Sequence, residues 1–239
     1  LGDVPITDPA LQAPGQFHHV QIVRQSVPDG LNISVIATPD INGVPGAPIT
    51  LLSNQFIFGA SLYDYRVQVA GRSGGLDTDI DLDNFRTSHV SRPAQSHTQT
   101  NFSFGTGSGW KGYLHGIVPA SGNPAGPGPE VRNDLSQNGN FLRLINDTVN
   151  DQRNSVVFDK QLDGVVGEAA GITADFDFRV SSADGSLADG FAFMLLPTAV
   201  YGDTGPGAGV NLPAAEEPSI PGLFAIGVDF FNGRPAWSC

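Results

Sequence analysis

The chain has 239 residues, of which 40% are hydrophobic and 15% charged, a composition typical of a globular protein rather than a disordered one. Its 24 acidic and 12 basic residues give a formal net charge of −12 without any basic stripe, which argues against nucleic acid and anionic membranes as partners. The sequence shows neither a membrane-spanning apolar run nor a leader, so we expect a mature form or excised piece without membrane insertion.

Short segments with period-two alternation, separated by Gly, Pro, Asn and Asp, predict antiparallel strands. Between the first two, Pro28-Asp29-Gly30 predicts a hairpin turn in which Pro fixes φ and Gly accepts a positive φ. No amphipathic stretch of helical period exceeds two turns, so the expected fold class is all-β. In chain order the predicted strands are residues 17–24, 31–38, 63–70, 80–86, 141–144, 155–159, 171–180, 190–196 and 223–231.

Alternation also predicts which strands are covered. In residues 174–180 the apolar side chains Phe176, Phe178 and Val180 should face the core, while Asp175, Asp177 and Arg179 face water. Residues 191–196 and 224–228 are apolar throughout, as central strands covered on both faces would be. The polar run 87–100 predicts a linker, and the Pro- and Gly-rich run 118–129 predicts an exposed loop.

Several of these segments, in order and spacing, resemble the N-terminal two-thirds of a legume-lectin-like, concanavalin A-like domain: NFLRL (140–144), NSVVFD (154–159), ITADFDFRV (172–180), ADGFAFML (188–195) and FAIGVDFFN (224–232). Three earlier segments look like the C-terminal third of the same kind of domain: GQFHHVQIVR (15–24), YRVQVAGRSGG (65–75) and DIDLDN (79–84). The resemblance implies an antiparallel jelly-roll sandwich whose closing third comes first in this chain.

Three explanations fit this order: a circularly permuted domain, a fragment of a tandem array, or a chain whose two parts complete neighbouring copies. Residues 1–86 carry the C-terminal-third-like strands, residues 87–100 form the predicted linker, and residues 101–239 carry the N-terminal two-thirds. Together the two strand-bearing parts amount to one composite domain. The single cysteine, Cys239, excludes an intrachain disulfide, and either pairing with another chain or a fragment boundary accounts for it.

The resemblance implies a sugar-binding role for Asp189, which with Gly190 opens an apolar strand. An ionised carboxylate in a concave, partly dry site forms strong hydrogen bonds to hydroxyls, although an Asp before a strand also serves ordinary turns. Asp203 is a second candidate for contacting sugar or calcium, with an ordinary Asx turn as its alternative. Tyr201 or Trp110 would supply an aromatic platform.

The same resemblance implies a metal site on the strand that ends at Asp229 and Asn232. Asp229 takes the position of a lectin glutamate, but Phe231 stands where the second carboxylate ligand belongs. Calcium needs about six to eight oxygens, so the missing carboxylate argues against the full two-metal site, while Asn232 and loop carbonyls are compatible with calcium alone as a cofactor.

The alternating aspartates and the adjacent histidines are weaker candidates for a binding site. Asp77, Asp79, Asp81 and Asp83 alternate and would line one face of a strand, where either calcium neutralises them or, as we favour, water solvates them. His18 and His19 are adjacent on a strand and so point to opposite faces, one toward the core and one exposed, which prevents them from chelating one ion.

These features predict a secreted or cell-surface, non-catalytic carbohydrate-binding or adhesion module whose partner is a glycan. The alternative is a structural repeat unit of an extracellular fibre, sheath or adhesin that self-associates by strand exchange between copies. A weaker alternative is a glycan-cleaving enzyme, which needs two carboxylates about 5–9.5 Å apart in a cleft. The sequence does not reveal such a pair, because its four glutamates all stand in loop-like settings.

Overall fold

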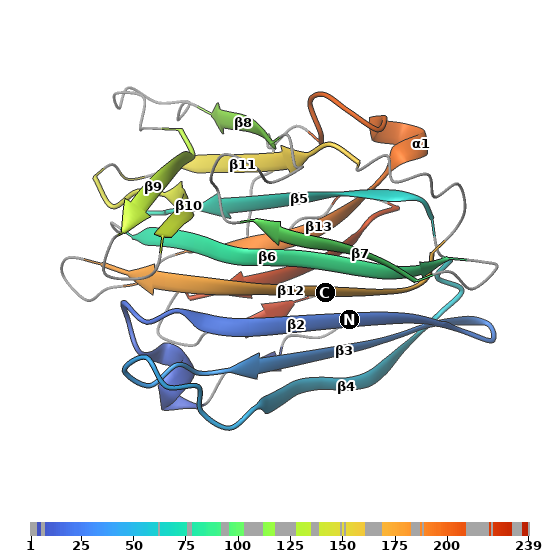
Figure 1. Cartoon of the computed structure of the whole chain (residues 1–239), viewed down its shortest axis with the longest axis horizontal. Helices are drawn as coiled ribbons and strands as arrows, with labels where there is room; N and C mark the ends of the chain where they lie inside the picture. Colours follow the sequence, from blue (N-terminus) through green and yellow to red (C-terminus); the bar gives the residue numbers. More distant parts are fainter. Residues whose placement is uncertain are drawn as a thin grey trace.

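The structure, a computed structural model, describes residues 4–5, 8–61, 63–75, 78–91, 96–102, 112–117, 128–134, 139–148, 150, 152–160, 169–182, 187, 189–208, 220, 222–230 and 236–238. Within these ranges the strands form two sheets, and Figure 1 shows one sheet behind the other with their strands running across the view. All strand pairs between described residues are antiparallel. The prediction of an all-β fold is thus confirmed.

The two sheets have seven and eight strands within the described residues. Neighbours in the seven-stranded sheet follow the order β1 (Val4–Pro5), β15 (Ala236–Ser238), β14 (Phe224–Asp229), β13 (Gly190–Pro197), β5 (Tyr65–Arg72), β11 (Arg153–Phe158), β8 (Gly112–Ile117). The eight-stranded sheet follows the order β4 (Ile49–Phe58), β3 (Gly30–Thr38), β2 (His18–Val27), β12 (Ala169–Ser181), β6 (Asp79–Ser91), β10 (Gly139–Ile145), β9 (Glu130–Asp134), with β7 (Ser96–Phe102) also paired to β6.

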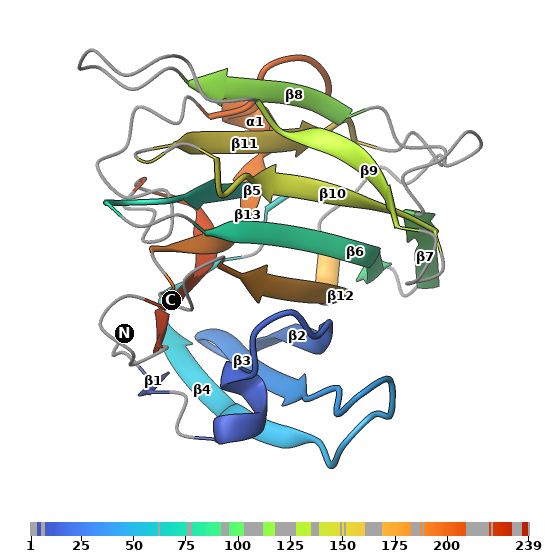
Figure 2. The same cartoon turned by 90° about the vertical axis from the view of Figure 1, so that its left-hand side faces the viewer.

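Strands from the early and the late part of the chain are interleaved in both sheets. β2 pairs with β12 over eight residues, from Phe178 opposite His18 to Gly171 opposite Gln25. β5 pairs with β13 from Gly190 opposite Arg72 to Pro197 opposite Tyr65. Figure 2 shows β2, β3 and β4 continuing the sheet that β12, β6, β10 and β9 form. The segment before residue 87 and the segment after residue 100 therefore share both sheets.

The core lies between the sheets and is rich in phenylalanine. Phe85, Phe176 and Phe193 stack with ring centroids 5.3–6.2 Å apart, and Phe178 and Phe191 extend the cluster at 5.4 Å. Phe176, Phe178 and Val180 of β12 are buried as the alternation predicted. Such aromatic contacts add to the large apolar area that each ring buries, so this cluster holds the two sheets together.

The uniformly apolar strands are central, as predicted. β13 lies between β5 and β14, and all of its residues except the last are buried. Its outer face, with Met194 and Leu196, is covered by residues that follow the strand, including Tyr201 and Ala208. Helix is short within the described residues: the 3₁₀ turn η1 (Pro9–Gln12) and one helix, α1 (Thr198–Tyr201). None of the described helices is long and apolar enough to cross a membrane.

Two local predictions need correction. In the β2–β3 turn it is Asp29 that adopts a positive φ, 65°, while Gly30 is required because a Cβ there would lie 2.2 Å from the carbonyl oxygen of Ile57. Much of the predicted linker at 87–100 is strand, since β6 runs to Ser91 and β7 begins at Ser96. The polar end of β6, from residue 87 onward, pairs with β12 on one side and with β7 on the other, so backbone hydrogen bonds order it.

All the predicted strands are present, with ends shifted by a few residues, and β4, β9 and four shorter or more polar strands are additional. The loop predicted at 118–129 lies mostly outside the described residues.

Candidate functional site

The residues predicted to bind sugar divide between the two ends of β13. Asp189, immediately before the strand, is 7% exposed, and its Oδ2 lies 3.0 Å from Nε of Arg72. A Cβ added to Gly74 would lie 2.7 Å from each carboxylate oxygen of Asp189, so this carboxylate packs closely against backbone. Gly190 contacts the next strand, because a Cβ there would lie 1.9 Å from the carbonyl oxygen of Val228. The described contacts of both residues are therefore structural.

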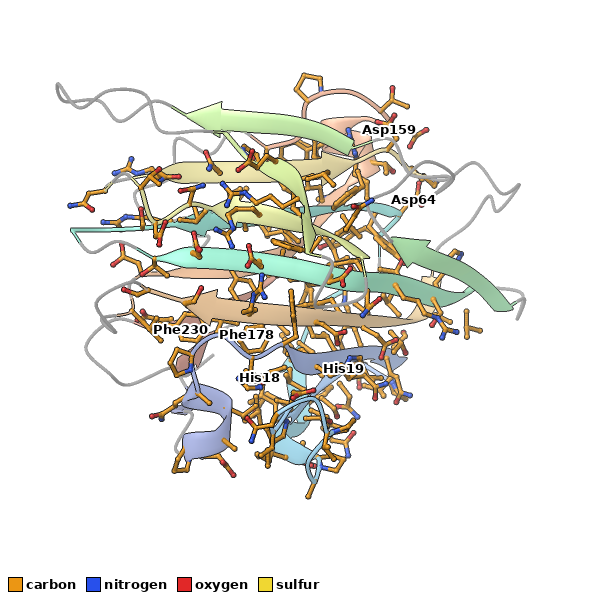
Figure 3. All side chains as sticks on the ribbon, turned by 60° about the vertical axis from the view of Figure 1, so that its left-hand side comes forward. His18, His19, Asp64, Asp159, Phe178 and Phe230 are labelled. Carbon is orange, nitrogen blue, oxygen red and sulfur yellow. The ribbon has the colours of Figure 1, made fainter. Side chains whose placement is uncertain are left out.

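Tyr201 and Asp203 lie beyond the other end of β13. The seven residue steps from Gly190 to Pro197 span roughly 23 Å, which separates them from Asp189. Arg66 fixes their loop by donating to the carbonyl oxygens of Tyr201 at 3.2 Å and Gly205 at 2.6 Å. Figure 3 shows Asp64 and Asp159 at this end of the molecule, far from His18 and His19. The four predicted sugar-binding residues do not form one site.

The predicted metal site is only partly described. Asp229 ends β14 opposite Gly190, close to Asp189, but Asn232 and Phe231 lie outside the described residues, as do Trp110 and Cys239. Across the ranges that the structure describes, no three His, Cys, Asp or Glu side chains are grouped so that they could hold a metal ion.

Two of the alternating aspartates, Asp79 and Asp81 of β6, pair with arginines and are not solvated by bulk water, the alternative that the sequence favoured. Asp81 is fully buried and accepts hydrogen bonds from Arg143 at 2.6 and 2.9 Å and from Arg179 at 2.8 and 3.0 Å. Asp79, 8% exposed, lies 2.5 Å from Nη1 of Arg143. Asp77 is outside the described residues. The prediction that Arg179 faces water is likewise wrong, since it is 9% exposed and its guanidinium lies 4.5 Å from the ring centre of Phe17.

A cavity of about 290 Å³ opens beside this network, on the outer face of the eight-stranded sheet. We call it the outer-face cavity. It brings together residues from β2 and the position before it, from β6 and β12, and from the end of β3 and the β3–β4 loop: Phe17, His19, Thr38, Pro39, Asp40, Gly43, Pro45, Asp83, Asn84 and Asp177.

Three strands place the polar groups at the base of the outer-face cavity. Nδ1 of His19 lies 2.8 Å from Oδ1 of Asp177, its cross-strand partner. Nδ2 of Asn84 donates to Oδ2 of the same carboxylate at 2.6 Å. Asp83 pairs with Asp177 across β6 and β12, and directly opposed residues have Cβ atoms about 4.5–5.5 Å apart. Two carboxylates thus meet beside an imidazole and an amide.

A β-bulge in β6 explains why Asp83 and Asn84 both reach this cavity. Asp177 pairs with Asp83 and Asp175 pairs with Arg86, so two residues of β6, Asn84 and Phe85, lie opposite one residue of β12. Asn84 adopts a positive φ of 49°. Asn tolerates this conformation better than most residues, and bulges commonly redirect side chains at sites. Phe85 then returns to the core.

The loop between β3 and β4 forms the wall of the outer-face cavity. Its tip is a tight turn with Asn42 and Gly43 at φ 57° and 83°, closed by the hydrogen bond from the amide of Ile41 to the carbonyl of Val44 at 2.9 Å. The amide of Asp40 donates to Nδ1 of His18 at 3.1 Å, and His18 packs edge-on against Phe178. As predicted, the two histidines point to opposite faces: His18 anchors the wall from the core, and His19 faces the cavity (Figure 3).

The charges of the site are set by these contacts. Bonding to Asp175 and Asp177 raises the pKa of His19 to about 9, so its imidazole is cationic at neutral pH. Burial, with the charge of Asp177 adding to it, raises the pKa of Asp83 to about 6. Burial alone would raise the pKa of Asp175 as well, but hydrogen bonds from His19 and Gln21 outweigh it and lower that pKa.

The sequence analysis placed Asp175 and Asp177 on a water-facing side and one of the two adjacent histidines on an exposed face, without joining these residues. One signal for the bulge was available: the core positions Ile80, Leu82 and Phe85 break the period of two between Leu82 and Phe85. The pairing of β2 with β12 and of β12 with β6, which creates the site, has no local signal.

Comparison with known proteins leaves the family open: no protein-family model matches the chain, and no curated protein matches its sequence.

Proposed function

We propose that the chain is a secreted, non-catalytic carbohydrate-binding module with a concanavalin A-like jelly roll, and that it takes a glycan at the outer-face cavity. One observation carries the proposal: two carboxylates, an amide and a cationic imidazole converge with Phe17 in one cavity. The packing of two antiparallel sheets is compatible with that architecture.

The chemistry of the site suits sugar hydroxyls. Asp83 and Asp177 accept hydrogen bonds, His19 and Asn84 donate them, and bonds that involve an ionised group are the stronger ones. Phe17 offers an apolar surface beside these groups. A cavity of about 290 Å³ lies at the small end of ligand pockets, so it suits one sugar unit of a longer glycan.

The test is glycan-array binding of the purified chain, compared with Asp177→Asn and Asn84→Ala. A hydrogen bond to a charged group contributes about 1.5–3 kcal/mol, so Asp177→Asn should weaken binding roughly ten- to hundredfold. The matched control is Asp203→Asn, which makes the same charge change on the exposed loop after α1 and should leave binding unchanged.

The array is repeated with calcium and with a chelator. The outer-face cavity binds hydroxyls through its own side chains, so binding should persist without metal. Binding that is lost with the chelator and insensitive to Asp177→Asn would instead place the site near Asp229, at the end of β14 beside Gly190. No binding to any glycan would contradict the proposal.

Release of shorter sugars from a bound glycan would favour the glycan-cleaving alternative. The opposed pair Asp83 and Asp177 is the observation that keeps this alternative open, because Asp83, with its raised pKa, has the character of a general acid.

A further inference from the structure

Arg24 is a buried cation on the core-facing side of β2. Its side chain is among the largest fully buried ones, and the residue is 2% exposed. Nη2 donates to the carbonyl oxygen of Ser61 at 2.9 Å. Nε and Nη1, which carry three N–H groups, have no hydrogen-bond partner within the part of the chain that the structure describes.

The other buried arginines of the described chain face carboxylates. Arg66 lies 3.4 Å from Asp159, and Arg143 and Arg179 share Asp81 at 2.6 and 2.8 Å. Arg24 has no ion pair of this kind within the described residues; its guanidinium carbon lies 4.9 Å from the ring centre of Tyr63 and 5.2 Å from that of Phe224. Cation–π contacts offset part of the cost of burial but do not supply acceptors for the N–H groups.

The electrostatic surroundings agree with this geometry. Burial lowers the pKa of Arg24, and the groups that oppose this effect are Tyr63, which also forms a side-chain hydrogen bond with the guanidinium, and Tyr65 rather than any carboxylate. A guanidinium stays protonated in proteins, so the buried site carries a positive charge in a chain whose net charge is −12.

Arg24 lines a cavity of about 370 Å³ at one end of the sandwich, between the two sheets. Tyr63 stands in its wall, and its hydroxyl donates to the carbonyl of Leu195 at 2.8 Å and accepts from the amide of Phe224 at 2.6 Å. The cavity is otherwise mostly apolar, with Leu31, Ile57, Leu223, Phe224 and Ala225 among its walls.

An apolar pocket with one buried, incompletely bonded cation matches a ligand with an anionic end and an apolar body. We propose that this cavity binds a small organic carboxylate, whose carboxylate accepts hydrogen bonds from Arg24 and whose alkyl or aryl body lies against the apolar walls. Arginine binds carboxylates with directed, charge-assisted hydrogen bonds, and desolvation strengthens them. The site is on the opposite face of β2 from the outer-face cavity and does not depend on glycan binding.

The experiment compares octanoate, 1-octanol and octylamine as probes of the full chain. These molecules share an alkyl body and differ in charge, so they separate recognition of the anion from apolar binding. We expect octanoate at about a hundredfold excess over its Kd to raise Tm by about 5–10 °C, and the alcohol and amine to have little effect. Equal shifts with octanoate and octanol, or no shift with octanoate, would overturn the proposal.

The variant Arg24→Met tests the role of the cation. It removes the buried charge and keeps an unbranched side chain, so it should fold at least as stably as the native chain and lose at least tenfold in octanoate affinity, measured by calorimetry. Arg86→Met, on an exposed residue of β6, is the matched control and should bind octanoate like the native chain. Undiminished binding to folded Arg24→Met would contradict the assignment, and the comparison of probes on the native chain decides the matter if the variant does not fold.

Discussion

Asp81 is a fully buried carboxylate that accepts hydrogen bonds from two arginines on neighbouring strands, Arg143 and Arg179. Replacing it with Asn would leave Arg143 and Arg179 buried without their shared counter-ion. Breaking one side of a buried ion pair costs about 3–5 kcal/mol, so we expect Asp81→Asn to lower the free energy of unfolding by this amount in urea titrations. Asp203→Asn, on the surface, should change it by less than about 0.5 kcal/mol. A loss below about 1 kcal/mol for Asp81→Asn would mean that the arginines find other partners.

His19 and Asp83 make stability depend on pH in the same direction. The folded protein holds the proton of Asp83 up to a pKa of about 6, against an ordinary value of 3.8 in the unfolded chain, and that of His19 up to about 9, against 6.5. The stability that each contributes is therefore present below its unfolded pKa and falls as pH rises through these windows.

The corresponding variants separate the two windows. Subtracting the Tm profile of Asp83→Asn from that of the native chain should give a difference that declines between about pH 4 and 6; for His19→Gln the decline should lie between about pH 6.5 and 9. A flat difference in either window would show that the group is not perturbed as its contacts imply.

The sequence could predict that His18 and His19 face opposite ways, because alternation along a strand is local. It could also place the aspartates of β6 on one face. It could not predict that arginines neutralise them, since Arg143 and Arg179 lie 62 and 98 residues from Asp81 in the chain and meet it only through strand pairing.

At the scale of elements, β4 is the longest of the strands that alternation failed to find. Its sequence places Leu51 and Leu52 side by side, and its pairing with β3 shifts register near Val35. As the edge of its sheet it is mostly exposed, so burial imposes little pattern on it. β6 shows the opposite case: its polar end at residues 87–91 was predicted as a linker because ladder hydrogen bonds leave no apolar signal.

The exposed edge of β4 should mediate self-association. Residues 41–63 contain no charged side chain, although the whole chain carries −12, and Phe58 and Phe56 are 80% and 43% exposed. Natural edge strands usually carry charges or proline that prevent pairing, and Ile49–Phe58 has neither. Two copies can pair their β4 edges antiparallel, so we expect concentration-dependent dimers in sedimentation velocity experiments.

Phe58→Lys should shift this equilibrium to monomer by placing a like charge on both edges. The control is Val200→Lys, which alters a residue that is 71% exposed on α1. A native chain that stays monomeric at all concentrations would contradict the role of β4 and remove support for the structural-unit alternative.

At the scale of the whole molecule, alternation sufficed to predict the all-β class and most strands, and the resemblance led us to expect both ends of the chain in one domain. The order of strands within each sheet is a property of long-range pairing and could not be read from single segments. The two cavities depend on that order: one needs β12 between β2 and β6, and the other needs β2 and β3 facing β14.

The alternation of early and late strands also governs how the protein can be made. While only residues up to the end of β10 have left the ribosome, β2, β3 and β4 can form a meander, but β2 lacks β12 and β5 lacks both of its partners. The eight-stranded sheet is complete only after β12, and the seven-stranded sheet cannot cover the phenylalanine core before β13 emerges. Non-local pairing of this kind folds slowly. During that interval the uncharged edge of β4 is exposed, so newly made chains would depend on chaperones, or on low concentration, to escape premature association.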